Sequence, residues 1–252
     1  MSEKDCEALL SKARSYESQA TGTVAGQEYI EKAADKLREA GDCYFKLKNY
    51  EKALNCYTEA YKHHKKINYT VSAAMDSERM ARCYQNLGKK VEFEKLMQEA
   101  AATYADQGEK MSMAGNLVSA ALLYSDSAMA YKALSNYDSF KNCFELAAQN
   151  YSEYAEILLE ERDYGYAAAN LSWAAMCSFA ISNFDDAAKK ADRALELCSK
   201  NNIKDENYDV AALSKAICSR DSSKSRQLFD RIKDNFSESE IKIVNQCLEN
   251  LR

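Results

Sequence analysis

The stretch GDCYFKLKNYEKALNCYTEA, residues 41–60, combines small and aromatic residues at helical spacing. The small residues Gly41 and Ala53 allow two antiparallel helices to approach closely. Tyr44 and Tyr57 are then placed to fill the groove between the two helices. The stretch therefore predicts one helical hairpin with a closely packed crossing.

The same spacing returns three more times along the chain. With Tyr44, Tyr84, Tyr131 and Ser178 as the marker, the steps are 40, 47 and 47 residues. A tetratricopeptide (TPR) repeat has a period of about 34 residues, so this pattern is of TPR type with longer helices. We expect an all-α fold, a right-handed superhelix of TPR-like antiparallel helical hairpins, in which each hairpin contacts its neighbours.

Composition favours a nearly all-helical chain. The 252 residues include no proline, which would break helix interiors, and only seven glycines. Gly88, Gly108 and Gly165 are expected at breaks, where a positive φ is useful. The length suits an array better than one globular core, because each hairpin of an array buries its apolar face against its neighbours.

The positions of the breaks predict the organisation of the chain. We expect a helix over 3–20, a flexible turn at 21–27, and four pairs: 27–47 with 50–67, 71–87 with 90–106, 110–134 with 137–160, and 166–182 with 185–200. Three shorter helices, near 206–219, 222–235 and 238–251, are expected to form a C-terminal helical bundle cap, with Ser222 and Ser237 as N-caps. The predicted domains are a hairpin array, 1–202, and the cap, 203–252.

Charge and cysteine content limit the functional classes. The net charge of −5 argues against a nucleic-acid partner, and the absence of a long apolar run argues against a membrane span. We expect a cytoplasmic protein with at most peripheral membrane association through its partners. Disulfides are not expected there, and Cys43, Cys83 and Cys177, which recur at one position of the repeat, are interpreted as small buried apolar fillers.

Residues that could carry chemistry are few. His63 and His64 are the only histidines, and neighbours on a helix point about 100° apart, so they cannot clasp one metal ion. We interpret them as part of a solvated helix end. The sequence also has no phosphate-binding loop or dinucleotide fingerprint. We therefore expect no enzyme activity, no metal and no cofactor, and favour a protein-binding role.

A peptide-binding groove is a sharper hypothesis. TPR domains that hold chaperone C-termini resemble one another in a clamp of Lys, Asn and Arg on their inner helices. The corresponding positions here are Arg38, Asp42, Met75, Arg79, Leu122 and Asp126. Asp42 and Asp126 would repel a terminal carboxylate, which sets this clamp aside. A generic TPR-type scaffold that binds another short linear peptide stays open as an alternative.

The long period, the end of the repeat near residue 200 and the C-terminal cap together resemble the SNAP family. These soluble attachment proteins link SNARE bundles to the N-ethylmaleimide-sensitive fusion ATPase. Three stretches are similar in order: EYIEKAADKLREAGDCYFKLKNYEKALNCYTEA at 28–60, MQEAAATYADQGEKMSMAGNLVSAALLY at 97–124, and DSSKSRQLFDRIKDNFSESE at 221–240. The terminal ENLR is similar to the family's penultimate leucine after acidic residues.

The resemblance implies an adaptor that couples a coiled-coil SNARE-type bundle to an AAA ATPase for complex disassembly in vesicle trafficking. It implies ATPase contacts at Leu251, Glu249 and Glu240. The client contacts that it implies on the concave face are Arg38, Lys62, Arg79, Arg82, Asn116 and Asn170. An ordinary solvated residue is the alternative at each of these positions. Two features depart from the family: the 21–27 segment has only Val24 for membrane attachment, and two concave positions are asparagine rather than basic.

Overall fold

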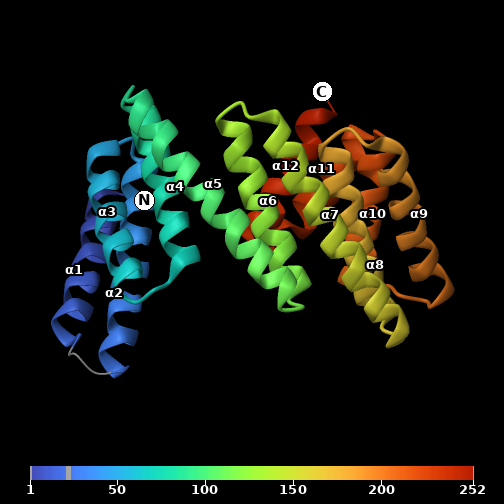
Figure 1. The fold of residues 1–252 in the computed structure, drawn as a ribbon, viewed down its shortest axis with the longest axis horizontal. Helices are drawn as coiled ribbons and strands as arrows, with labels where there is room; N and C mark the ends of the chain where they lie inside the picture. Colours follow the sequence, from blue (N-terminus) through green and yellow to red (C-terminus); the bar gives the residue numbers. More distant parts are fainter. Residues whose placement is uncertain (1, 21–23, 252) are drawn as a thin grey trace. The chain divides into compact units, whose positions relative to one another are not determined.

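The structure is a computed structural model that describes residues 2–20 and 24–251. Within these ranges the chain forms twelve α-helices and one 3-10 turn (Figure 1). Consecutive helices pack in antiparallel pairs, which confirms the predicted all-α, TPR-like array. Contacts divide the chain into two compact units, Met1–Tyr104 and Ala105–Arg252.

The first unit is built from four helices and the start of a fifth. They are α1 (Glu3–Gln19), α2 (Val24–Lys46), α3 (Tyr50–Lys66), α4 (Thr70–Asn86) and α5 (Lys90–Met113), which crosses the boundary. α2 packs on α1 and α3, and α3 packs on α4. Tyr44, Ala53 and Tyr57 are buried in its core, as the hairpin pattern predicts.

Gly41 fixes the helix crossing in this unit. A Cβ atom at residue 41 would lie 2.5 Å from Cε1 of Tyr57, so any larger residue would displace the ring. The predicted close approach of α2 and α3 is therefore confirmed, and it depends on the missing side chain of Gly41.

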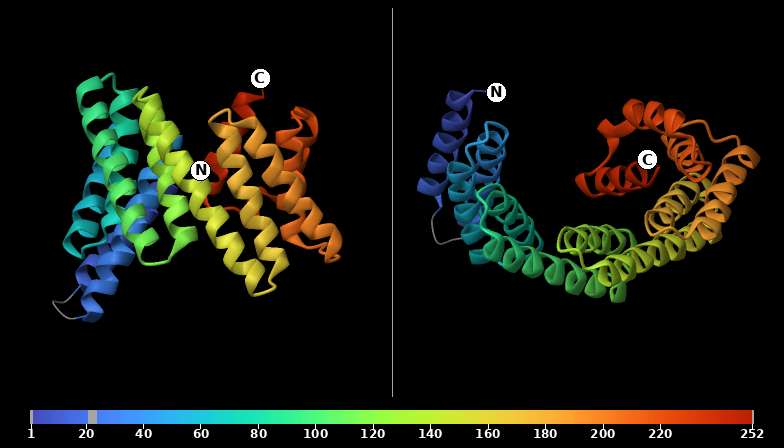
Figure 2. Two further views of the ribbon diagram at one scale, coloured as in Figure 1. Left: turned by 45° about the vertical axis from the view of Figure 1, so that its right-hand side comes forward. Right: turned by 90° about the horizontal axis from the view of Figure 1, so that it is seen from above.

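The second unit adds the remaining elements. They are α6 (Leu117–Ala133), α7 (Tyr137–Glu160), α8 (Tyr164–Ala180), α9 (Phe184–Lys200), α10 (Glu206–Cys218), α11 (Ser222–Ile232), η1 (Lys233–Asn235) and α12 (Glu238–Asn250). α10 packs on α8 and α9, whereas α12 turns back and packs on α6 and α8. Figure 2 shows α12 inside the arc that the other helices of this unit form.

One turn geometry recurs at the helix ends. Nine residues within the described part of the chain have φ between 55° and 77° and directly follow a helix C-cap: Lys48, Asn68, Gly88, Gly115, Ser135, Arg162, Ser182, Asn202 and Arg220. In each case the N–H of the next residue donates to the carbonyl oxygen five residues earlier in the chain, as Asn49 does to Tyr44 at 2.9 Å. This Schellman motif satisfies carbonyls that the helix leaves open.

Most of the predicted helix boundaries agree with the structure, and two glycines account for the errors. The break expected at Gly108 is wrong, because α5 continues to Met113 and the chain turns at Gly115. Gly108 instead makes room for Tyr124, whose ring lies 3.2 Å from where a Cβ would stand. Gly165 lies in the first turn of α8 and not in the break.

The helix caps and the first turn also differ in part from the prediction. Ser237 caps α12 as expected and forms a capping box with Glu240, but Asp221 rather than Ser222 caps α11. Residues 21–23 of the predicted turn lie outside the described residues, and 24–27 belong to α2. The division after residue 202 falls inside the second unit and stays a prediction.

Cys43 is bonded to Cys6, so the expectation of no disulfides is wrong for this pair. α1 packs beside α2 with the two Cα atoms 5.5 Å apart, a separation that a disulfide spans. The predicted role of the other recurring cysteines is confirmed, since Cys83 and Cys177 are buried thiols. Among the described residues, no helix is both long and apolar enough to cross a membrane.

Candidate protein-binding surfaces

A buried charged cluster joins α2, α3 and α4 in the first unit. Arg38 Nε donates to Asp76 Oδ1 at 2.8 Å, and His64 Nδ1 lies 2.6 Å from Asp76 Oδ2. Asp76 and His64 are 0% and 1% exposed. The prediction that His64 belongs to a solvated helix end is wrong, because α4 packs over the end of α3 and supplies a carboxylate to the imidazole. His63 lies 2.7 Å from Glu17 on α1.

The same face carries two further clusters of charged and phenolic groups. Arg79 Nε donates to Asp42 at 3.3 Å, and the Tyr57 hydroxyl donates to the same carboxylate at 2.7 Å. Burial and this hydrogen bond raise the pKa of the Tyr57 hydroxyl. Arg82 and the Tyr104 hydroxyl both donate to the buried Glu78 carboxylate. The arginines of α2 and α4 are therefore engaged by carboxylates of the same unit.

The structure distributes the proposed client contacts between the two units. Arg38, Arg79 and Arg82 lie in these clusters, and Lys62 is exposed on α3. Asn116 is exposed at the start of α6, whereas Asn170 is buried on α8 and donates to the Tyr166 carbonyl at 2.8 Å. Their role in client binding stays a prediction.

The three proposed ATPase contacts all lie on or next to α12. Glu240 accepts hydrogen bonds from the backbone and side chain of Ser237 at the start of the helix. At the other end Glu249 forms an ion pair with Lys132 of α6 at 2.5 Å, and Leu251 packs against the core of the unit. Glu240 and Glu249 are thus about 14 Å apart along the helix axis.

Polar contacts hold α12 on α6 and α8. Lys242 and Ser239 both bind the carboxylate of Asp126, at 2.9 and 2.6 Å. Asn250 donates to the Ala180 carbonyl at 2.9 Å. Ile243, Val244 and Cys247 are fully buried on the same helix. The cap therefore does more than cover the last hairpin, because its final helix occupies the inner face of α6 and α8.

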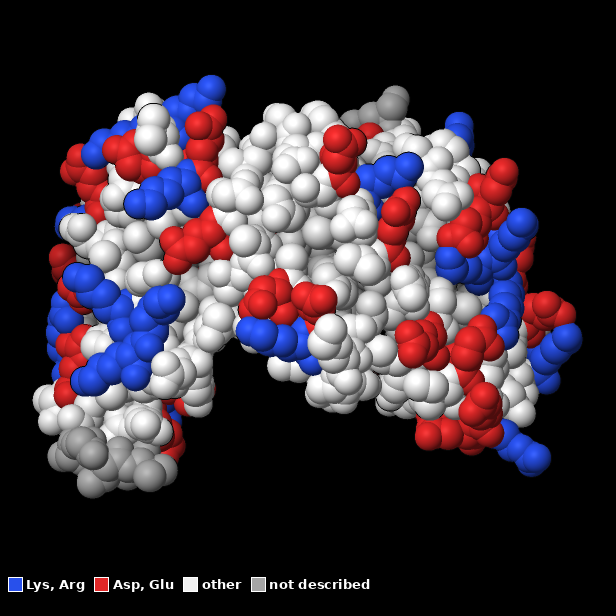
Figure 3. All heavy atoms as spheres, in the orientation of Figure 1, with Lys and Arg blue, Asp and Glu red and all other residues white. Residues whose placement is uncertain are grey.

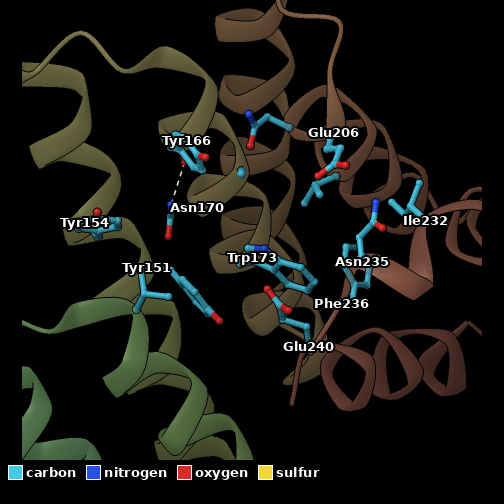
Figure 4. A pocket seen from close by; sticks show the side chains of 14 residues that line it. Tyr151, Tyr154, Tyr166, Asn170, Trp173, Glu206, Ile232, Asn235, Phe236 and Glu240 are labelled. Atoms are coloured by element: carbon cyan, nitrogen blue, oxygen red, sulfur yellow. Dashed lines mark hydrogen bonds between the residues drawn. The ribbon is translucent and has the colours of Figure 1, made fainter. Parts of the chain in front are cut away.

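Beside α12 the second unit contains a pocket of about 400 Å³ (Figure 4). α8 and α10 form one wall, and η1 and the start of α12 form the other. The residues that line it are Val118, Tyr151, Tyr154, Tyr166, Ala169, Asn170, Trp173, Glu206, Asn207, Val210, Ile232, Asn235, Phe236 and Glu240. Its volume lies in the range of ligand-binding pockets.

This pocket could hardly be predicted from the sequence, because its lining comes from seven separate elements. Asn170 and Glu240 were singled out for other roles, as a contact to a SNARE bundle and as a contact to an ATPase. Trp173, the only tryptophan of the chain, packs edge-on against Phe236 with ring centroids 5.0 Å apart. An uncommon aromatic residue on the inner helix of a repeat is the one signal that could have indicated the site.

Side chains of both charges lie on the face of the molecule that Figure 3 shows. Lys and Arg side chains are interspersed with Asp and Glu side chains over most of its charged parts, and a group of Lys and Arg side chains lies at the lower left.

Comparison with known proteins finds a tetratricopeptide repeat and similar helical structures. The tetratricopeptide repeat family matches residues 34–66, in α2 and α3. The crystal structure of BtubC (BKLC) from P. vanneervenii is similar with a TM-score of 0.53 and 15% identity, over 92% of this chain and 89% of that one. Yeast Tom70 matches 98% of this chain and 59% of its own, with 16% identity and a TM-score of 0.29. No curated protein sequence matches the chain.

The repeat match and the BtubC likeness concern the fold. They agree with the paired helices, the Gly41–Tyr57 crossing and the recurring turn geometry described above. The chain is therefore a TPR-like helical-repeat protein.

Proposed function

We propose that this chain is a non-catalytic scaffold that binds a segment of another protein in the pocket beside α12. The observation that carries the proposal is the pocket itself, which lies on the inner helix α8 and is walled by aromatic side chains. Aromatic residues are enriched at protein interfaces, where they bury large areas at a small cost in conformational entropy. The TPR-like fold supports a role in protein interaction.

The experiment selects displayed random peptides on the intact chain and measures their affinities by fluorescence anisotropy. Ala169, which is 9% exposed and lines the pocket, is changed to Phe to fill it. Ala133→Phe, at an exposed position near the end of α6, is the matched control. We expect micromolar binding that Ala169→Phe weakens at least about tenfold, a loss of about 1.4 kcal/mol, and that Ala133→Phe leaves unchanged. Failure to select any peptide, or equal binding by both variants, would contradict the proposal.

A narrower proposal is that the chain is a SNAP-like adaptor between a coiled-coil SNARE-type bundle and an AAA ATPase. The sequence resemblance supports it. The ion pair of Lys132 with Glu249 and the packing of Leu251 imply that the last turn of α12 would leave its place to meet an ATPase.

The narrower proposal is tested with a purified SNARE bundle and N-ethylmaleimide-sensitive fusion ATPase. We expect the chain to bind the bundle and to stimulate ATP hydrolysis, and deletion of residues 251–252 to abolish stimulation while the chain stays folded, with at most a small decrease in melting temperature. Full stimulation by the truncated chain would remove the role of Leu251. A chain that binds selected peptides but no bundle would be a scaffold of another class.

A further inference from the structure

We propose that the pocket beside α12 binds a basic side chain, arginine or lysine, of the partner segment. The inference rests on the proposed scaffold function and names the chemistry that its pocket recognises. Its basis is the combination of aromatic walls, uncompensated carboxylates and one buried hydroxyl without a partner.

Two carboxylates face the pocket from opposite sides. Glu206 begins α10 and Glu240 lies in the first turn of α12, and Figure 4 shows them at opposite ends of the lining. Neither forms an ion pair with another described residue. Glu240 uses only Oε2 for its two hydrogen bonds to Ser237. None of the lining residues is Lys, Arg or His, so the pocket carries two negative charges.

Aromatic rings supply the walls between these carboxylates. Trp173 and Phe236 are packed against each other, and Tyr154 and Tyr166 stand on the α7 and α8 side. The face of an aromatic ring attracts a cation, and tryptophan does so most strongly. An apolar ligand would use the rings but would leave the two carboxylates without a partner.

A buried polar atom provides the independent observation. Tyr151 is 1% exposed, and its hydroxyl has no hydrogen-bond partner among the residues that the structure describes. In Figure 4 the hydroxyl end of Tyr151 and the Glu240 carboxylate lie below Trp173. A buried polar atom without a partner is costly, and a guanidinium or ammonium group that enters here can donate to the phenolic oxygen.

Neighbouring charges do not cancel this preference. Burial raises the pKa of the Tyr151 hydroxyl, and the charges of Glu240 and Asp126 raise it further. Lys242 of α12 forms an ion pair with Asp126 at 2.9 Å. Asp126 is therefore compensated within the unit, whereas Glu206 and Glu240 form no ion pair with a residue that the structure describes.

Trp173 makes the test direct, because the only indole of the chain reports on the pocket. Nα-acetyl-arginine amide and Nα-acetyl-lysine amide are titrated into the intact chain while the Trp173 indole ¹H–¹⁵N resonance is followed. The citrulline and norleucine amides are the uncharged controls. We expect saturable binding of the two basic amides with Kd on the order of millimolar, and at least about fivefold weaker binding of both controls.

Variants separate charge from fold. Glu240→Gln keeps the capping box, because glutamine also serves at N3, and Glu206→Gln keeps the shape of the first turn of α10. Each is expected to weaken arginine amide binding about three- to tenfold. Glu160→Gln, at the exposed end of α7, is expected to change nothing. Equal binding of norleucine and arginine amides, or unchanged binding by both pocket variants, would overturn the inference.

The two proposals can fail separately. Selected peptides that need an open pocket but contain no basic residue would overturn this inference and leave the scaffold function intact. Saturable binding of arginine amide without any peptide ligand would leave the cation site intact and overturn the scaffold function.

Discussion

The side-chain amide of Asn250, the last residue of α12, donates a hydrogen bond to the carbonyl oxygen of Ala180, the last residue of α8, at 2.9 Å. The final carbonyls of a helix lack intrahelical donors, and here a second helix supplies one. With the ion pair of Lys132 and Glu249, this bond holds the end of α12 on the inner face of the second unit.

Asn250→Asp tests this anchor. The substitution keeps the shape of the side chain but replaces the donor with a carboxylate that faces the Ala180 carbonyl. We expect a loss of about 1–3 kcal/mol in the free energy of unfolding, measured by urea denaturation, and faster proteolysis after residue 236. Asn55→Asp, at an exposed position of α3, is the matched control and should be nearly neutral. Equal stability of the two variants would show that the Asn250 bond contributes nothing.

Gly41→Ala tests the helix crossing of the first hairpin. The added Cβ would lie 2.5–2.9 Å from three atoms of the Tyr57 ring, so the ring or the helix must move. Overpacking of this kind costs about 1–3 kcal/mol. Gly108→Ala meets the Tyr124 ring at 3.2–3.3 Å and should cost less. Thermal unfolding of the two variants gives the comparison, and a larger loss for Gly108→Ala would contradict the role of Gly41.

Arg162→Gly tests the recurring turn. Arg162 has φ 63°, a conformation that costs an L-residue about 1–2 kcal/mol and glycine almost nothing. Glycine is also more flexible in the unfolded chain, which offsets part of this advantage. We therefore expect the free energy of unfolding to increase by about 0.5–1 kcal/mol. Arg226→Gly, at an exposed position inside α11, should instead lose about 1 kcal/mol. Chemical denaturation should therefore show a higher free energy of unfolding for Arg162→Gly and a lower one for Arg226→Gly than for the wild type. A change of the same sign in both variants would contradict the turn assignment.

The disulfide between Cys6 and Cys43 predicts a dependence of stability on redox conditions. It closes a segment with a sequence separation of 37, which corresponds to about 3–4 kcal/mol in the chain-entropy model. We expect a reductant to lower the melting temperature of the wild type and of Cys83→Ser, but not of Cys6→Ser.

A thiol count provides the second measurement. The unreduced, denatured chain should show seven reactive thiols out of nine cysteines. Nine thiols under oxidising conditions would show that the bond does not form.

Asp76→Asn tests the buried cluster of the first unit. The substitution removes the negative charge of the carboxylate that Arg38 and His64 contact. Arg38 and His64 themselves stay largely buried. Breaking a buried ion pair costs about 3–5 kcal/mol. Arg38→Met together with Asp76→Asn should cost less than the sum of the two single changes in urea denaturation. Strict additivity would show that the two residues do not interact.

The fold was largely predictable because its signal is local and repeated. The spacing of Tyr44, Tyr84 and Tyr131 indicates the period, and the missing proline allows long helices. The exception at Gly108 has a physical cause, since a glycine that admits a neighbouring ring cannot be told from a turn glycine by sequence alone. The direction of α12 was not predictable either, because it depends on contacts such as Lys132 with Glu249, 117 residues apart.

The candidate sites were predicted less well than the fold. The prediction of a solvated His64 fails because its partner Asp76 comes from the next helix. The arginines expected to face a client are paired with carboxylates one helix away, as Arg79 is with Asp42. The pocket around Trp173 draws its lining from α6 to α12 and has no compact sequence motif. Each of these features depends on contacts between different helices, which the sequence of a single helix does not reveal.

The recurring turn also bears on how such a chain can grow. Gly88, Ser135 and Ser182 are every second one of these left-handed residues, and each is 47 residues from the next. A duplicated copy of residues 89–135 would therefore begin and end in the same backbone conformation as the junction that receives it. Duplication of this unit would lengthen the array by one helical pair without a new kind of connection.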